Sequence, residues 1–243
     1  MLTTVLILSV IGAGVVADLF GKYFIAYRNY ILSFSVSIVL TLICLHIIPE
    51  IFSHHKSHLG YFLLAGFLLQ ILLELLSKGI EHGHVHFHGK ITINQMGVIF
   101  IGLCIHAIIE GIPMFTFEHE DHLLHEHKNV EFTWVYFTAI LIHKLPIAIV
   151  LMFFLNNMES SIYKRYALLV LFSITTPLGA VFGEEIMHLD LFSDWAPTLL
   201  ALTTGMLLHI TTLLIFEDHH HSNDKYKNVM IIMLGIGIGA LLF

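Results

Sequence analysis

Residues 104–113 read CIHAIIEGIP and lie inside a long apolar run that begins near Ile91. His106 and Glu110 are four residues apart in this stretch, so an α-helix would place both side chains on one face, within reach of one ion. A charged side chain at the centre of a bilayer-spanning helix costs on the order of 2.5–3.5 kcal/mol on insertion scales. An ionisable pair at such a position therefore predicts a functional site.

A second apolar run, from Phe132 to Leu155, carries the sequence HKLP at residues 143–146. If one run ends near Phe117 and the next starts near Phe132, His106 and His143 each lie about 16 Å from the same membrane face, at about 1.5 Å per residue. The two imidazoles and Glu110 would then converge. One explanation is a structural ion pair between Glu110 and Lys144; the other is a metal site on a path through the membrane.

Two prolines accompany these candidate ligands, Pro113 in the first run and Pro146 in the second. Each removes a backbone donor and can interrupt the helical hydrogen bonds, which would free carbonyl groups to face an ion or water. Proline alone is weak support, because kinks are common in membrane helices. Its position beside the candidate ligands strengthens the prediction of a site.

The composition is that of an integral membrane protein. Hydrophobic residues make up 57% of the chain and charged residues 12%, compared with about 25% charged residues in an ordinary soluble domain. Histidine is unusually frequent, at 19 of 243 residues, and it is the commonest nitrogen ligand for transition metals. The composition therefore indicates a membrane protein that handles a transition metal.

The apolar runs predict an all-α membrane protein with a single transmembrane domain. Helices are favoured over barrel strands because the runs are long and continuously apolar. The first run has no basic residue before it, so we expect a first span and not a cleaved signal peptide. The eight predicted spans are 2–19, 30–52, 60–79, 93–116, 132–155, 166–183, 197–216 and 229–243.

The distribution of Lys and Arg predicts the orientation in the membrane. The loops after the odd-numbered spans hold Lys22, Arg28, Lys78, Lys90, Lys164, Arg165, Lys225 and Lys227, whereas the other loops hold only Lys56 and Lys128. Cytoplasmic loops carry the excess of basic residues. We therefore expect both termini outside, in a plasma (inner) membrane.

Histidine-rich and acidic segments mark both sides of the predicted bundle. On the cytosolic side, we interpret two histidine tracts as a weak metal receiver, with Glu217 and Asp218 as a candidate release station; the tracts are His82, His84, His86 and His88, and His219, His220 and His221. On the outer side, acidic loops would raise the local cation concentration. His46 and Glu50, four residues apart, are candidates for a first binding station there.

The paired motifs of the fourth and fifth spans give the chain a family resemblance. The pattern from His106 to Gly111, together with His143-Lys144-x-Pro146, resembles the ZIP family of zinc and iron transporters. Other segments agree, namely HIIPE at residues 46–50, the histidine-rich loop at 82–88, PLG at 177–179 and GMLLHITT at 205–212. The resemblance extends over essentially the whole chain.

The resemblance implies uptake of divalent metal into the cytosol through eight helices with both termini outside. It also implies inverted repeats, helices 1–3 and 6–8, around helices 4 and 5, and an elevator-like or rocking motion. Some members hold two metals, but this chain departs from them: Ala107, Lys144, Ile147 and Thr176 stand at the positions of second-metal ligands.

We therefore expect a mononuclear site of His106, Glu110 and His143. Lys144 would compensate Glu110 in the absence of metal, Thr176 marks the remnant of the second site, and His46, His209 or water would be a fourth ligand. Two imidazoles and a carboxylate suit Zn(II), which is our first expectation, and also Fe(II) or Mn(II). The metal is cargo; we expect no cofactor and no catalytic residue.

Two other functions compete with transport. A histidine-rich membrane di-iron oxidase or hydroxylase would need its histidine boxes together on one side, and a metal sensor that transports nothing would bind without flux. We favour a transporter over an enzyme. We expect divalent metal ions and bilayer lipid as partners, consider a homodimer and expect no nucleic-acid partner.

Overall fold

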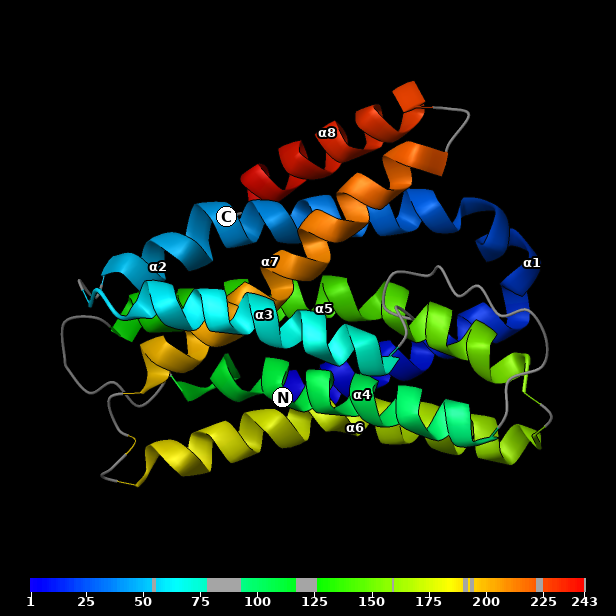
Figure 1. The fold of residues 1–243 in the computed structure, drawn as a ribbon, viewed down its shortest axis with the longest axis horizontal. Helices are drawn as coiled ribbons and strands as arrows, with labels where there is room; N and C mark the ends of the chain where they lie inside the picture. Colours follow the sequence, from blue (N-terminus) through cyan, green and yellow to red (C-terminus); the bar gives the residue numbers. More distant parts are fainter. Residues whose placement is uncertain are drawn as a thin grey trace.

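The chain folds into a bundle of long α-helices, most of which lie roughly along one axis (Figure 1). The computed structural model describes residues 1–53, 56–77, 93–116, 126–158, 160–189, 192, 195–221 and 225–242. The helices are α1 (Leu2–Leu42), α2 (Ile48–Ser53), α3 (Leu59–Ser77), α4 (Ile93–Gly111), α5 (Glu126–Asn156), α6 (Ile162–Met187), α7 (Ala196–His221) and α8 (Lys225–Leu242). A π-helix (η1, Ile43–Ile47) joins α1 to α2, and a 3-10 helix (η3, Ile112–Met114) extends α4.

Helix α1 contains two spans joined by a kink. Phe20 has non-helical backbone angles (φ −114°, ψ 19°). Figure 1 shows α1 turning back on itself at the right-hand end of the bundle. The apolar stretches on either side, Leu2–Gly21 and Asn29–Ser53, are each long enough to cross a membrane. The kink therefore divides α1 into two antiparallel membrane helices.

Within the described residues, six helical stretches have the length and hydropathy of membrane spans, and two shorter apolar helices, Leu59–Leu75 and Tyr226–Leu242, accompany them. Every regular element described is helical. The prediction of an all-α integral membrane bundle is confirmed. The inverted repeats and the single-domain assignment stay predictions.

The prolines act differently at different positions. Helix α5 continues through Pro146 without interruption, whereas α4 ends at Gly111 and Pro113 lies in the tighter turn η3. Near Pro49, which cannot donate to the carbonyl one turn earlier, the preceding turn widens into the π-helix η1. His46 lies in that widened turn.

Glycines allow two pairs of helices to touch through their backbones. A Cβ atom at Gly179 or Gly183 of α6 would collide with the carbonyl oxygens of Ile108 and Ile112, and one at Gly111 would collide with the carbonyl oxygen of Thr176. Close approach through a small-xxx-small pattern is typical of membrane helices. It presses the candidate-ligand helix α4 directly against α6.

Helices α3 and α7 make the same kind of contact. A Cβ at Gly66 would meet the carbonyl oxygen of Leu202, and one at Gly205 would meet that of Leu63. The contact is reciprocal, because each helix offers a glycine to a carbonyl of the other. It fixes α7 against the helix that carries Gln70 and Glu74.

Candidate functional site

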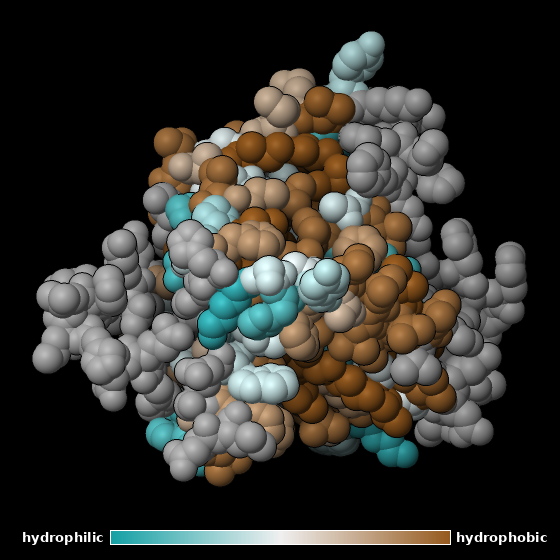
Figure 2. Space-filling view, turned by 60° about the vertical axis from the view of Figure 1, so that its left-hand side comes forward, coloured by the Kyte–Doolittle hydropathy of each residue, from teal (hydrophilic) through white to brown (hydrophobic). Residues whose placement is uncertain are grey.

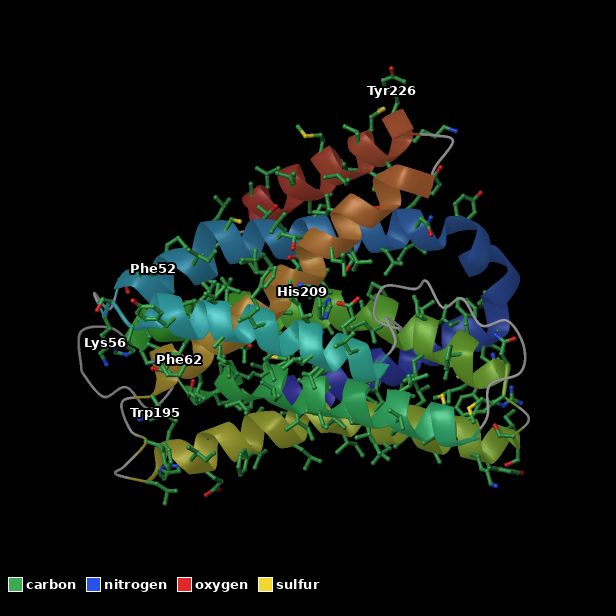
Figure 3. The ribbon with its side chains drawn as sticks, viewed as in Figure 1. Phe52, Lys56, Phe62, Trp195, His209 and Tyr226 are labelled. Carbon is green, nitrogen blue, oxygen red and sulfur yellow. The ribbon has the colours of Figure 1, made fainter. Side chains whose placement is uncertain are left out.

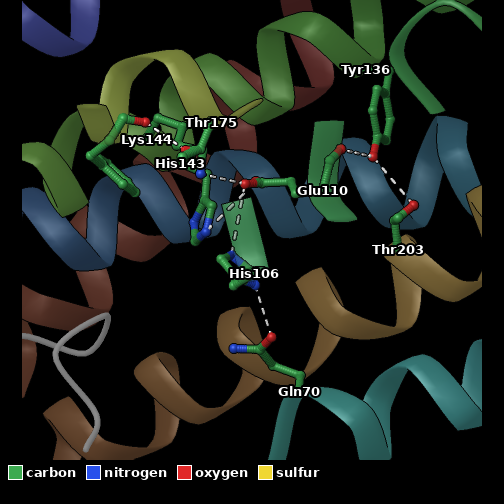
Figure 4. Close-up of polar contacts among 9 residues, drawn as sticks. Gln70, His106, Glu110, Tyr136, His143, Lys144, Thr175 and Thr203 are labelled. Atoms are coloured by element: carbon green, nitrogen blue, oxygen red, sulfur yellow. Dashed lines mark hydrogen bonds and ion pairs between the residues drawn. The ribbon is translucent and has the colours of Figure 1, made fainter. Parts of the chain in front are cut away.

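Three candidate ligands meet inside the bundle. His106 and Glu110 come from α4 and His143 from α5, and their exposed fractions are 0%, 1% and 3%. One ligand atom from each residue lies within 4.8 Å of the others. Both helices reach this point near the middle of the candidate spans Met96–Met114 and Phe132–Asn156. The structure therefore brings the predicted trio together inside the bundle (Figure 4).

The carboxylate of Glu110 lies between the two imidazoles. His106 Nε2 is 3.7 Å from Glu110 Oε2, and His143 Nε2 is 3.9 Å from Glu110 Oε1. The two rings stand nearly perpendicular, with their centroids 6.0 Å apart. Each imidazole thus presents the same kind of nitrogen to a different oxygen of one carboxylate.

Lys144 supplies the counter-charge. Its ammonium Nζ lies 2.8 Å from Glu110 Oε2 and 4.9 Å from the ring centroid of Phe172 on α6, a distance suited to a cation–π interaction. Lys144 is 1% exposed. Burial strengthens the attraction between the two charges. The ammonium expected from the sequence to compensate Glu110 does lie against it.

Gln70 of α3 orients His106. Its Oε1 lies 2.8 Å from His106 Nδ1, and both residues are completely buried. An amide oxygen only accepts hydrogen bonds, so the neutral imidazole donates from Nδ1 and carries its lone pair on Nε2, the nitrogen nearest Glu110. Gln70 thus behaves like the outer partners that fix the tautomer of metal-binding histidines.

Tyr136 connects the cluster to α7. Its hydroxyl donates to the backbone carbonyl oxygen of Glu110 at 2.8 Å and lies 3.2 Å from Thr203 Oγ1. The bond falls where α4 gives way to η3, and the ring is fully buried. Tyr136 therefore holds the backbone of a candidate ligand to a neighbouring helix.

His209 of α7 has a partner outside the trio. Its Nε2 lies 2.9 Å from Glu74 Oε2 of α3, and Phe67 meets its ring edge-on, with centroids 4.8 Å apart. Glu74 follows Gln70 by one helical turn, so α3 contacts two of the buried histidines, His106 through Gln70 and His209 through Glu74. The structure does not group His209 with the three candidate ligands.

The remaining predicted residues lie elsewhere or outside the described part. His46 and Glu50 are half-buried in η1 and α2, and are not grouped with the trio. Thr176 of α6 is buried, and its backbone carbonyl meets Gly111. The loop residues His82, His84, His86 and His88 lie outside the described residues, as do the side chains of Glu217, Asp218, His219, His220 and His221 at the end of α7.

The sequence prediction identified some of these partners and missed others. Gln70 and Glu74 share one face of the apolar run at residues 60–79, a placement that predicts interhelical hydrogen bonds, and both make them. Tyr136 and Thr203 were not identified, because a tyrosine in an apolar run is usually a packing residue. The glycine contacts were also missed, although the GxxxG spacing of Gly179 and Gly183 was readable in the sequence.

Comparison with known proteins agrees with this architecture. The family model described as ZIP zinc transporter matches residues 81–243 of the chain. Protein zntD of Dictyostelium discoideum is 26% identical over 172 residues, an alignment that covers 65% of this chain and 24% of zntD. The chain therefore spans about a quarter of the length of that curated relative. Because the family model covers well over half of the sequence, the chain belongs to the ZIP zinc transporter family.

Proposed function

We propose that the protein imports a divalent metal ion across a membrane through a single site made by His106, Glu110 and His143. The observation that carries the proposal is the convergence of these three buried side chains at mid-span, with ligand atoms within 4.8 Å of one another. Ionisable groups at this depth mark ion pathways in membrane proteins. Family membership supports the same class of cargo.

The spacing of the trio suits one transition-metal ion. Two ligand atoms about 2.0–2.1 Å from a tetrahedral zinc lie about 3.4 Å apart. The nitrogen–oxygen distances of 3.7 and 3.9 Å go to different oxygens of Glu110, and one ligand atom from each residue lies within 4.8 Å of the others, so the side chains would have to move inward to place three ligands on one ion. Zinc is the first expectation, and Fe(II) or Mn(II) would accept the same nitrogen and oxygen donors.

Lys144 would favour release of the bound metal ion. The ammonium pairs with Glu110 at 2.8 Å, so an incoming divalent cation competes with a charge that is tethered to the same helix as His143. Transport requires binding strong enough for capture and weak enough for departure. A resident ammonium lowers affinity and stabilises Glu110 when the metal leaves.

The direction of transport is taken from the family resemblance, and the orientation of the chain in the membrane from the distribution of basic residues. The eight basic loop residues that follow the odd-numbered spans would face the cytosol, which puts both termini outside. The acidic loops on the outer side would attract cations toward the site. We therefore propose uptake into the cytosol, across a plasma or inner membrane.

Metal flux into proteoliposomes tests the proposal. The purified protein should load zinc into vesicles, and His106→Ala and Glu110→Gln should each reduce the initial rate to the level of empty vesicles. His188→Ala, at an exposed position after α6, is the matched control and should transport normally. Binding without flux in the wild type would indicate a metal-binding protein that does not transport.

A further inference from the structure

A cavity of about 260 Å³ opens at one end of the bundle, away from the candidate ligands His106, Glu110 and His143. It is lined by Lys56, His58, Phe62, Trp195 and Thr198. In Figure 3 the labelled side chains of Lys56, Phe62 and Trp195 lie together at this end, where α3 and α7 begin. The cavity combines a cationic group with aromatic walls.

The walls are rings set edge to face. The centroid of His58 lies 6.2 Å from that of Phe62, and the centroid of Phe62 lies 6.5 Å from that of Trp195. The centroid of Phe192 lies 5.5 Å from that of Trp195, again edge to face. Perpendicular packing fixes the rings relative to one another. A ligand would therefore meet preformed apolar walls.

One cationic side chain and two helix N-termini lie at the cavity. Lys56 is exposed, and the N-terminal ends of two long helices, α3 at Leu59 and α7 at Ala196, converge on the cavity with the positive ends of their dipoles. First-turn amides at such ends favour anionic groups such as phosphate. Thr198 adds a hydroxyl to the lining from the first turn of α7.

The cavity lies at the level where lipid headgroups meet the bundle. Lys56 and His58 fall between the span that ends at Ser53 and the apolar helix that begins at Leu59, and Trp195 precedes the span that begins at Ala196. Phe52 and Tyr61 nearby are 49% and 77% exposed. Figure 2, with this end turned forward, shows hydrophilic side chains bordered by hydrophobic ones. Aromatic and basic residues are typical of a membrane–water interface.

We propose that this cavity binds the headgroup phosphate of a phospholipid, with Lys56 on the phosphate and the rings of Phe62 and Trp195 against the glycerol and upper acyl chains. A free phosphate would leave the aromatic walls without a partner. The inference does not depend on metal transport.

Native mass spectrometry of the protein released from detergent micelles tests this assignment. With dioleoylphosphatidylcholine, the wild type should retain one lipid per chain, and Lys56→Ala should weaken apparent affinity about tenfold, as expected for loss of a charge-assisted contact. Lys56→Arg should retain the lipid. Lys164→Ala, which removes an exposed lysine at the opposite end of α6, should bind like the wild type.

Two further experiments show which part of the lipid the cavity recognises. Dioleoylglycerol, which has the same chains and no phosphate, should not be retained, and millimolar inorganic phosphate should not displace the lipid. Trp195 can report locally, because Trp134→Phe leaves it as the sole tryptophan, and phosphatidylcholine with brominated acyl chains should then quench its fluorescence. Equal retention by Lys56→Ala and the wild type, retention of dioleoylglycerol, or displacement by phosphate would each overturn the proposal.

Discussion

The ammonium of Lys144 lies 2.8 Å from the carboxylate of Glu110, and both side chains are almost completely buried in the middle of the membrane-spanning bundle. The pair places one positive and one negative charge among two imidazoles. A divalent cation that binds Glu110 must therefore overcome the repulsion of a neighbouring ammonium. In the proposed metal site, this relationship would set both the affinity for the ion and the stability of the site without it.

Replacing Lys144 with Met should tighten metal binding at least about tenfold, because the repulsion between the ammonium and the ion disappears. Release should slow, so the maximal uptake rate should fall together with KM. The metal-free variant should lose about 3–5 kcal/mol of stability, as Glu110 would be left buried without its counter-charge. Uptake kinetics and thermal unfolding, each measured with and without zinc, check these outcomes. An unchanged KM in Lys144→Met would contradict the assigned role, and Lys164→Met is the control.

The wild type should bind one zinc ion per chain in the bundle. Lys144 is placed against Glu110, and the described ligand cluster contains three residues. His143→Ala should lower zinc affinity by about 100-fold. Loss of a residue that only orients a ligand lowers metal affinity by up to about 100-fold, and loss of a direct ligand should cost at least as much. Equilibrium dialysis with metal analysis measures the stoichiometry. Two tightly bound ions that both depend on Glu110 would refute the mononuclear site.

Gln70 should matter for affinity although it is not itself one of the three ligands. Gln70→Leu removes the acceptor for His106 Nδ1, so the imidazole is no longer held with Nε2 toward Glu110, and metal affinity should fall about 10- to 100-fold. Gln70→Glu keeps an acceptor and should restore most of the affinity. If the Leu and Glu variants bound metal equally, Gln70 would have only a packing role.

The contact between α4 and α6 should tolerate no side chain at Gly179. Gly179→Val would push against the backbone of Ile108 and should cost about 1–3 kcal/mol, the usual cost of overpacking, visible as a lower unfolding midpoint in detergent. Gly97→Ala in α4 is the control, because a Cβ there meets nothing within 4 Å and alanine favours the helix. Equal midpoints for the two variants would argue against close backbone packing.

Much of the fold was predictable because each span can be recognised in the sequence by its length and hydropathy. The four-residue spacing of His106 and Glu110 already placed them on one helical face, and the equal depth of His143 in the next span correctly anticipated its position beside them. The family resemblance is confirmed by the match over residues 81–243. That the trio holds metal stays a prediction.

The partners of the cluster were harder to predict because they depend on how helices rotate against one another. Nothing in the sequence around Gln70 indicates that its amide faces His106 and not another polar group. His209 illustrates the same limit: it was considered as a fourth ligand, but the packing of α7 against α3 directs it to Glu74. Tyr136 donates a hydrogen bond to the backbone carbonyl of Glu110, and a backbone partner of this kind cannot be predicted from a pattern of residues.

The glycine contacts bear on how access to the site can alternate. A helix whose backbone presses on its neighbour cannot slide past it without separating atoms that already touch. Gly111, Gly179 and Gly183 bind α4 to α6 in this way, and Gly66 and Gly205 bind α3 to α7. Any motion that exposes Glu110 first to one side and then to the other should therefore carry each pair as a rigid body. The shear between the two pairs would fall on the hydrogen bonds described above, from His106 of α4 to Gln70 of α3 and, through Tyr136 of α5, from the Glu110 carbonyl to Thr203 of α7.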